Sequence, residues 1–152
     1  MRSNIPRNKT FGVISFAFIF ISLTFNACSY IAPYSHFAYQ QATSLKVEAL
    51  ALMDKATEQS VSHDNEIKEL ETKIEKAYEY AKGRPKNELS TKQWQILKNP
   101  NRNLLGGFIK QWRKESTLST NFIKEAKGLV ADAFDTISGL ESGKIKKTML
   151  SN

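Results

Sequence analysis

The sequence predicts an all-α fold: a small bundle of four to five helices that begins with an antiparallel helical hairpin. Three observations support this prediction. Apolar residues between positions 36 and 143 recur at spacings of three and four, which places them on one face of a helix. Gly, Pro, Asn and Ser, which are typical of helix ends and turns, separate these stretches. No stretch of useful length alternates apolar and polar residues as a half-buried strand does.

The first two helices are predicted from about residue 36 to about residue 60 and from residue 64 to residue 82. Their apolar faces consist of Phe37, Gln41, Leu45, Ala49, Leu52 and Ala56, and of Ile67, Leu70, Ile74, Ala77 and Ala81. We expect Asp64 to cap the second helix, because its carboxylate can accept from the free amides of the first turn. Gly83 and Pro85 should end that helix. The short polar connection between the two helices predicts the hairpin.

Two shorter helices are predicted next. Ser90-Thr-Lys-Gln93 matches a capping box, and Asn99-Pro100-Asn101 is a turn signal that should end the helix. Another helix should start near residues 101–103. Its apolar face contains Leu104, Phe108 and Trp112. The pair Gly106-Gly107 should cost about 1 kcal/mol per residue relative to Ala, so either the backbone packs closely against a neighbour or the helix kinks there.

The last long helix carries a clear apolar stripe. The stripe contains Phe122, Ala126, Leu129, Val130, Ala133, Ile137 and Leu140. Ser119 or Thr120 can cap its start, and Gly143 is a plausible stop. Residues 144–152 form a basic tail, which we expect to be frayed.

The charge of the chain is unevenly placed. The 152 residues carry a formal net charge of +7, and Arg2, Arg7 and Lys9 supply +3 of it. Residues 1–27 contain no acid, so +7 less +3 leaves +4 for residues 28–152. This modest excess suits contact with anionic lipid or glycan, or serves only solubility. No basic stripe is interleaved with aromatic residues, so a nucleic-acid partner is not expected.

The N-terminal segment has the pattern of a secretory signal peptide. Residues 1–10 are polar and positive, and residues 11–25 are nearly all apolar. As a helix the apolar run would be about 22 Å long. That is short for a hydrocarbon core of about 30 Å. Ala27 and Cys28, the only cysteine of the chain, follow directly.

Phe25-Asn26-Ala27-Cys28 resembles the lipobox of bacterial lipoproteins, with Phe25 and Asn26 where that family usually has Leu and a small or hydroxylated residue. The resemblance implies that a diacylglycerol is attached to the Cys28 thiol. It further implies that the leader is cut off before Cys28 and that the new amino group is acylated. Ser29 in place of Asp would direct the protein to the outer membrane, facing the periplasm. The alternative is an uncleaved anchor helix with an incidental cysteine.

The expected organisation therefore has four parts. Residues 1–27 are the signal peptide and residues 28–35 a lipidated tether, while residues 36–143 form the helical domain and residues 144–152 the basic tail. The domain resembles small Gram-negative lipoproteins in general, a resemblance that implies no activity. We expect a membrane partner through the lipid and a protein partner in the envelope.

Two clusters in the domain are candidates for binding. The densest basic loop contains Lys82, Arg84 and Lys86, which could contact lipid headgroups or another anionic polymer, or could form an ordinary solvated turn. Three aromatic residues of the middle region could line a ligand groove or pack in the core. These residues are Trp94, Phe108 and Trp112.

The sequence does not suggest an enzyme. It contains neither G-x-S-x-G nor H-E-x-x-H, and its close carboxylate pairs, such as Glu69 with Glu71, lie on charged helix faces. His36 and His63 are expected to be ordinary helix-end or loop residues, and no catalytic, cofactor or metal site is expected. The leading hypothesis is a lipid-anchored envelope protein with a helical interaction domain. The alternative is a binding module for an anionic envelope polymer or lipid headgroup.

Overall fold

The computed structural model describes residues 32–145, which form a helical bundle without a strand. The helices are α2 (His36–Asp54), α3 (Asp64–Gly83), α4 (Glu88–Lys98), α5 (Leu105–Glu115) and α6 (Thr120–Glu141), with two 3₁₀ turns, η1 (Lys55–Thr57) and η2 (Ser60–His63), between α2 and α3. The predicted small all-α bundle with an N-terminal antiparallel hairpin is therefore confirmed.

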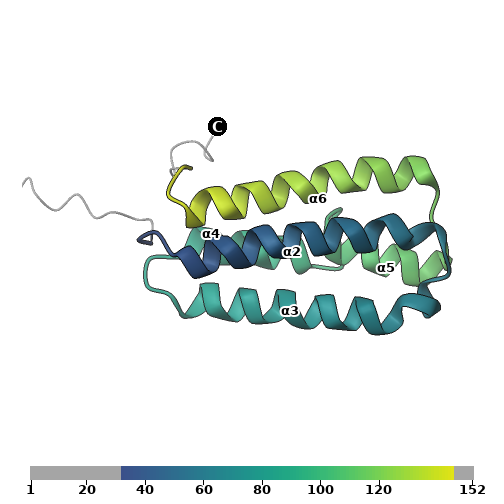
Figure 1. The fold of residues 1–152 in the computed structure, drawn as a ribbon, viewed down its shortest axis with the longest axis horizontal. Helices are drawn as coiled ribbons and strands as arrows, with labels where there is room; N and C mark the ends of the chain where they lie inside the picture. The colour runs from purple at the N-terminus through teal and green to yellow at the C-terminus, as the bar shows by residue number, and fades with distance from the viewer. Residues whose placement is uncertain (1–31, 146–152) are drawn as a thin grey trace, which may run out of the picture.

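The helices form four rods around one core. Three rods are the long helices α2, α3 and α6, and the fourth consists of α4 and α5, which follow one another along the bundle (Figure 1). α2 packs between α6 and α3, and α4 packs against α3 and α6. The predicted apolar faces supply most of the core, which includes Leu45, Ile67, Leu70, Ile74, Leu97, Val130 and Ile137. Three large residues assigned to those faces are instead exposed: Phe37, Phe122 and Leu129.

The bundle has two ends that differ in their connections. At the near end, which holds residues 32–37, 80–90 and 141–145, the described chain begins and ends (Figure 1). At the far end, which holds residues 54–66 and 112–120, the chain passes from α2 to α3 and from α5 to α6.

Two of the predicted caps are wrong. His63, not Asp64, is the N-cap residue of α3, and the Asp64 carboxylate instead accepts from Lys68 Nζ at 2.6 Å. α4 begins at Glu88, so Ser90 lies inside the helix rather than capping it. Ser90 is buried there, and its hydroxyl donates to the carboxylate of Glu141. In both places a side chain that could have capped a helix satisfies a charged partner instead.

α2 ends at Asp54, before the expected end near residue 60, and the chain continues in the two 3₁₀ turns. The remaining helix ends follow the predictions more closely. Ser119 caps α6, because its side chain accepts from the Phe122 amide at 3.3 Å. Gly143 follows the end of α6 with a φ of +72°, in the left-handed region that glycine tolerates best. α5 begins at Leu105, a little later than expected.

The double glycine marks a close approach of backbone segments. A Cβ at Gly106 would overlap the carbonyl group of Lys98, and a Cβ at Gly107 would overlap the carbonyl oxygen of Arg102. The connection after α4 therefore folds back over the first turn of α5. Close packing was one of the two explanations that the sequence left open, and the structure supports it.

Candidate functional site

The predicted lipidation residue, Cys28, lies outside the described residues 32–145, as does the apolar leader. Within the described part of the chain, no helix has the length and apolar character needed to cross a bilayer. The last residues of the predicted tether belong to the folded domain. Ala32 is buried, the Pro33 carbonyl accepts from Arg84 Nη2 at 2.6 Å, and Ser35 caps α2 through the Ala38 amide.

A buried carboxylate organises the near end. The side chain of Glu141 is only 1% exposed, at the last residue of α6. It accepts hydrogen bonds from Arg84 Nη1, from Asn87 Nδ2 at 3.2 Å and from Ser90 Oγ. Because Arg84 also binds the Pro33 carbonyl, this network joins the start of the domain, the α3–α4 connection and the end of α6. We refer to these four side chains as the Glu141 network.

The three cations of the basic loop do not converge on one site. Arg84 turns inward to Glu141, and its side chain is 14% exposed. Lys82 remains exposed and donates to Glu79 at 3.1 Å, an interaction that raises the pKa of the Lys82 amine. Lys86 is exposed, with a positive φ of 60°. An anion approaching this loop would therefore meet two exposed lysines rather than three free cations.

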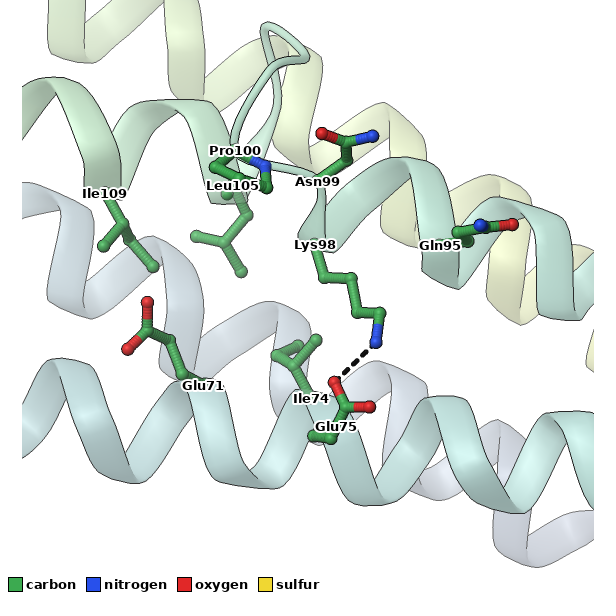
Figure 2. Close-up of a pocket in the computed structure, with 10 residues that line it drawn as sticks. Glu71, Ile74, Glu75, Gln95, Lys98, Asn99, Pro100, Leu105 and Ile109 are labelled. Carbon is green, nitrogen blue, oxygen red and sulfur yellow. Dashed lines mark hydrogen bonds and ion pairs between the residues drawn. The ribbon is translucent and has the colours of Figure 1, made fainter.

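A cleft of about 470 Å³ lies between α3, α4 and α5 (Figure 2). Its apolar wall is formed by Ile74, Leu105 and Ile109. The Lys98 side chain reaches from α4 to α3, where its Nζ donates to Glu75 Oε2 at 2.6 Å. On the same wall, Glu71 accepts both hydrogen bonds of a bidentate pair from Arg113, at 2.8 and 2.9 Å, which raises the pKa of the guanidinium.

The polar groups that line this cleft are either paired with an opposite charge or neutral. Both of its carboxylates are neutralised by a partner cation, and its remaining polar groups are amides and carbonyls. Across residues 32–145, no group of three or more His, Cys, Asp or Glu side chains is arranged to hold a metal ion.

A second groove of about 500 Å³ runs between α5 and α6. Phe122 and Leu129 line it and are 41% and 52% exposed. The Phe122 ring stacks on Phe108, with centroids 6.0 Å apart. Pro100 lines both this groove and the first cleft, so the two concave surfaces adjoin at the connection after α4. We refer to them together as the paired grooves.

Sequence reasoning missed the site of His63 at the far end. This side chain is buried, with Nδ1 at 2.8 Å from Glu66 Oε1 and Nε2 at 2.9 Å from Glu58 Oε2. The hydrogen bonds to Glu66 and Glu58 raise the pKa of the imidazole. Trp112 packs beside it, and its Nε1 donates to the Glu58 carbonyl at 2.9 Å. Acidic residues five positions before and three after the histidine were the available signal.

The remaining candidates lie where the simpler interpretation placed them. The middle-region aromatics are in the core, with Trp94, Phe108 and Trp112 all at most 3% exposed. Glu69 is exposed and pairs with Lys73.

Comparisons with protein family models, curated proteins and solved structures find no match to this chain. The function must therefore be argued from the residues themselves.

Proposed function

We propose that the chain is a lipid-anchored protein of a bacterial envelope, whose helical domain holds a protein partner near the membrane. The observation that carries this proposal is the leader of the sequence. A positive segment, a short apolar run and Ala27 precede the only cysteine of the chain, Cys28. Two or more acyl chains at such a residue give stable membrane attachment, whereas one chain binds reversibly.

The paired grooves support the second half of the proposal. Exposed apolar side chains beside concave surfaces are typical of protein interaction sites, and Phe122 and Leu129 provide them on α6. The titratable groups of the first cleft are held in ion pairs, which suits recognition more than proton transfer. We infer that a partner segment with an apolar side chain docks next to Pro100.

Binding of an anionic polymer by the basic loop has weaker support. Arg84 would have to leave Glu141 to take part, because its guanidinium is already committed. Lys82 and Lys86 remain as exposed contacts. If they bind a polyanion, the variant Lys82→Gln/Lys86→Gln should lose affinity and the salt dependence of binding should weaken. Unchanged binding by this variant would exclude the loop.

The anchor is tested by intact mass and by labelling cells with a radioactive fatty acid. The mature protein should begin at Cys28 and carry acyl chains, and Cys28→Ser should abolish the label. A purified native protein that begins at Met1 with an unmodified thiol would refute the anchor.

The docking surface is tested by placing a photo-crosslinking amino acid at Leu129 in living cells. Val47 is the matched control, because it is an aliphatic residue of α2, 68% exposed and outside the grooves. One crosslinked product should form from position 129 and not from position 47. The same products from both positions, or none from position 129, would contradict partner binding in the paired grooves.

A further inference from the structure

We propose that the near end of the bundle rests on the lipid surface, with an aromatic patch of Tyr34, Phe37 and Tyr80 at the level of the headgroups. The inference deepens the proposed function and rests on the anchor at Cys28. It concerns the orientation of the domain, which an anchor alone leaves open: a tethered bundle could also stand away from the membrane or lie along it.

The patch consists of a ring pair on two helices and a third exposed ring just before the first of them. Phe37 at the start of α2 and Tyr80 near the end of α3 have ring centroids 4.8 Å apart and are 56% and 39% exposed. Tyr34 is 58% exposed, and its hydroxyl lies 3.1 Å from His36 Nδ1. The Tyr80 hydroxyl lies 3.4 Å from Ser35 Oγ. Rings with an apolar body and a polar tip are the side chains that membrane–water interfaces favour.

The length of the tether indicates what covers the patch. Only residues 29–31 separate Cys28 from Ala32, which is buried in the domain. Four Cα–Cα steps span at most about 14 Å when fully extended. That is less than the width of a small folded domain, because even 100 residues have a radius of gyration of about 13 Å. If Cys28 is embedded in lipid, the near end therefore faces the bilayer with no room for a protein between them.

The charges of the near end suit an anionic lipid surface. Lys82, Lys86 and Lys144 are exposed there, and the sequence continues with Lys146 and Lys147. Two exposed carboxylates share this end: Glu79, which pairs with Lys82, and Glu88. The buried pair of Arg84 with Glu141 adds no net charge. Lysines close to a membrane are attracted to anionic headgroups over roughly a Debye length.

The orientation also agrees with the place of the paired grooves. α2 spans about 28 Å at 1.5 Å per residue over its 19 residues. The first cleft lies midway along α3, where α4 gives way to α5, and the second lies between α5 and the first turns of α6, so neither is lined by residues of the near end. With the aromatic patch on the lipid, they remain open to a partner in the aqueous space.

Hydroxyl-radical footprinting of the native protein, purified from its membranes and placed in vesicles, tests this orientation. The vesicles contain phosphatidylethanolamine with a minority of phosphatidylglycerol, and oxidation is read by mass spectrometry at Phe37 and Phe122. The two residues have the same intrinsic reactivity, and Phe37 is the more exposed, at 56% against 41%. Without a cover Phe37 should therefore oxidise at least as fast as Phe122. We expect it to oxidise several-fold more slowly, and an equal or faster rate would overturn the proposal.

A matched pair of variants separates lipid contact from other causes of protection. Phe37→Ser/Tyr80→Ser removes two rings of the patch, and Phe122→Ser/Leu129→Ser removes two exposed apolar residues away from it. Oxidation of Tyr34 should rise several-fold in the first variant and stay unchanged in the second. No rise in the first variant, or an equal rise in both, would count against the patch as the contact.

Two further readings distinguish the remaining explanations. Protection of Phe37 should not change when the protein is diluted in excess lipid, and protection that disappears on dilution would show that a second copy covers the patch. The intact mass of the same sample reports the anchor. An unmodified Cys28 defeats the anchor and this inference together, whereas an acylated Cys28 with a rapidly oxidised Phe37 defeats the inference alone.

Discussion

At each end of the bundle, carboxylates pair with a basic side chain, but these carboxylates differ in their access to water. At the near end Glu141 is 1% exposed and accepts from three side chains. At the far end Glu58 and Glu66 are 64% and 48% exposed and flank His63. The same kind of interaction, a carboxylate with a basic side chain, is therefore shielded from water at the near end and open to water at the far end.

The largest expected effect comes from removing the buried carboxylate of Glu141. Glu141→Ala removes the carboxylate that pairs with the Arg84 charge and the acceptor of the Ser90 hydroxyl, while Asn87 keeps its hydrogen bond to the Ala81 carbonyl. Breaking a buried pair in this way costs about 3–5 kcal/mol of unfolding free energy. Urea denaturation should show this loss. The control Glu79→Ala breaks an exposed pair, so its loss of stability should be far smaller. Equal losses would mean that the Glu141 network is no tighter than a surface pair.

A double substitution sharpens the same prediction. Replacing a whole buried ion pair by apolar residues of similar size is often neutral, because the desolvation cost of both charges disappears. Arg84→Met/Glu141→Leu should therefore recover much of the stability that Glu141→Leu alone loses. Simple addition of the two single losses would contradict the view that Arg84 serves mainly to neutralise Glu141.

The Glu141 network also shows which features the sequence could predict. The apolar stripe of α3 and the glycines that end α3 and α6 depend on local spacing, and the predictions from them are confirmed. The predicted stripe of α6 is confirmed only in part, because Phe122 and Leu129 are exposed. Glu141 looks like any acid at a helix end, and its partner Arg84 lies 57 positions away. Ser90 was misinterpreted as a cap for the same reason. The prediction of a lipid at Cys28 depends on a resemblance and stays a prediction.

The middle of the bundle provides the next largest effect, independent of charge. Gly106→Ala would force a methyl group into the carbonyl group of Lys98, and backbone cannot yield as a flexible side chain would. Overpacking of this kind costs about 1–3 kcal/mol. Gly128→Ala is the matched control, because no atom lies within 4 Å of a Cβ at that helical position. It should gain about 0.5–1 kcal/mol. Urea denaturation should give opposite signs for the two variants, and a stabilising Gly106→Ala would refute the close approach.

The helix caps allow a comparison of the two ends with the same residue type. Ser35 accepts from the Ala38 amide at 3.2 Å at the near end, and Ser119 from the Phe122 amide at 3.3 Å at the far end. Each Ser→Ala change should cost about 1 kcal/mol, as capping residues usually do. Thermal unfolding should give similar losses for the two variants. A much larger loss for Ser35→Ala would show that residues 32–35 contribute more to the near end than their cap.

The smallest expected effect is the pH dependence of the stability that His63 and its two carboxylate partners contribute. The pKa of His63 is raised above its ordinary value of 6.5, chiefly by the hydrogen bond to Glu66 and then by that to Glu58. A group whose pKa is higher in the folded protein stabilises the fold fully below its unfolded pKa, and this stabilisation is lost as the pH rises through the folded pKa. The pKa of Glu66 is lowered from 4.5, chiefly by Lys55 and then by His63, so its contribution is lost as the pH falls below that value.

The stability contributed by the interactions of His63 with Glu58 and Glu66 should therefore be largest between pH 4.5 and pH 6.5 and should decline above that window. Comparing urea denaturation of the native protein with that of His63→Gln at several pH values isolates it, because the packing lost beside Trp112 does not depend on pH. His36→Gln is the control, since His36 is exposed and is hydrogen-bonded to the Tyr34 hydroxyl rather than to a carboxylate. A stability difference for His63→Gln that stays constant as the pH rises would mean that folding does not raise the pKa of His63, and one that grows would mean that folding favours the neutral imidazole. The stability contributed by the far end would then not fall as the pH rises.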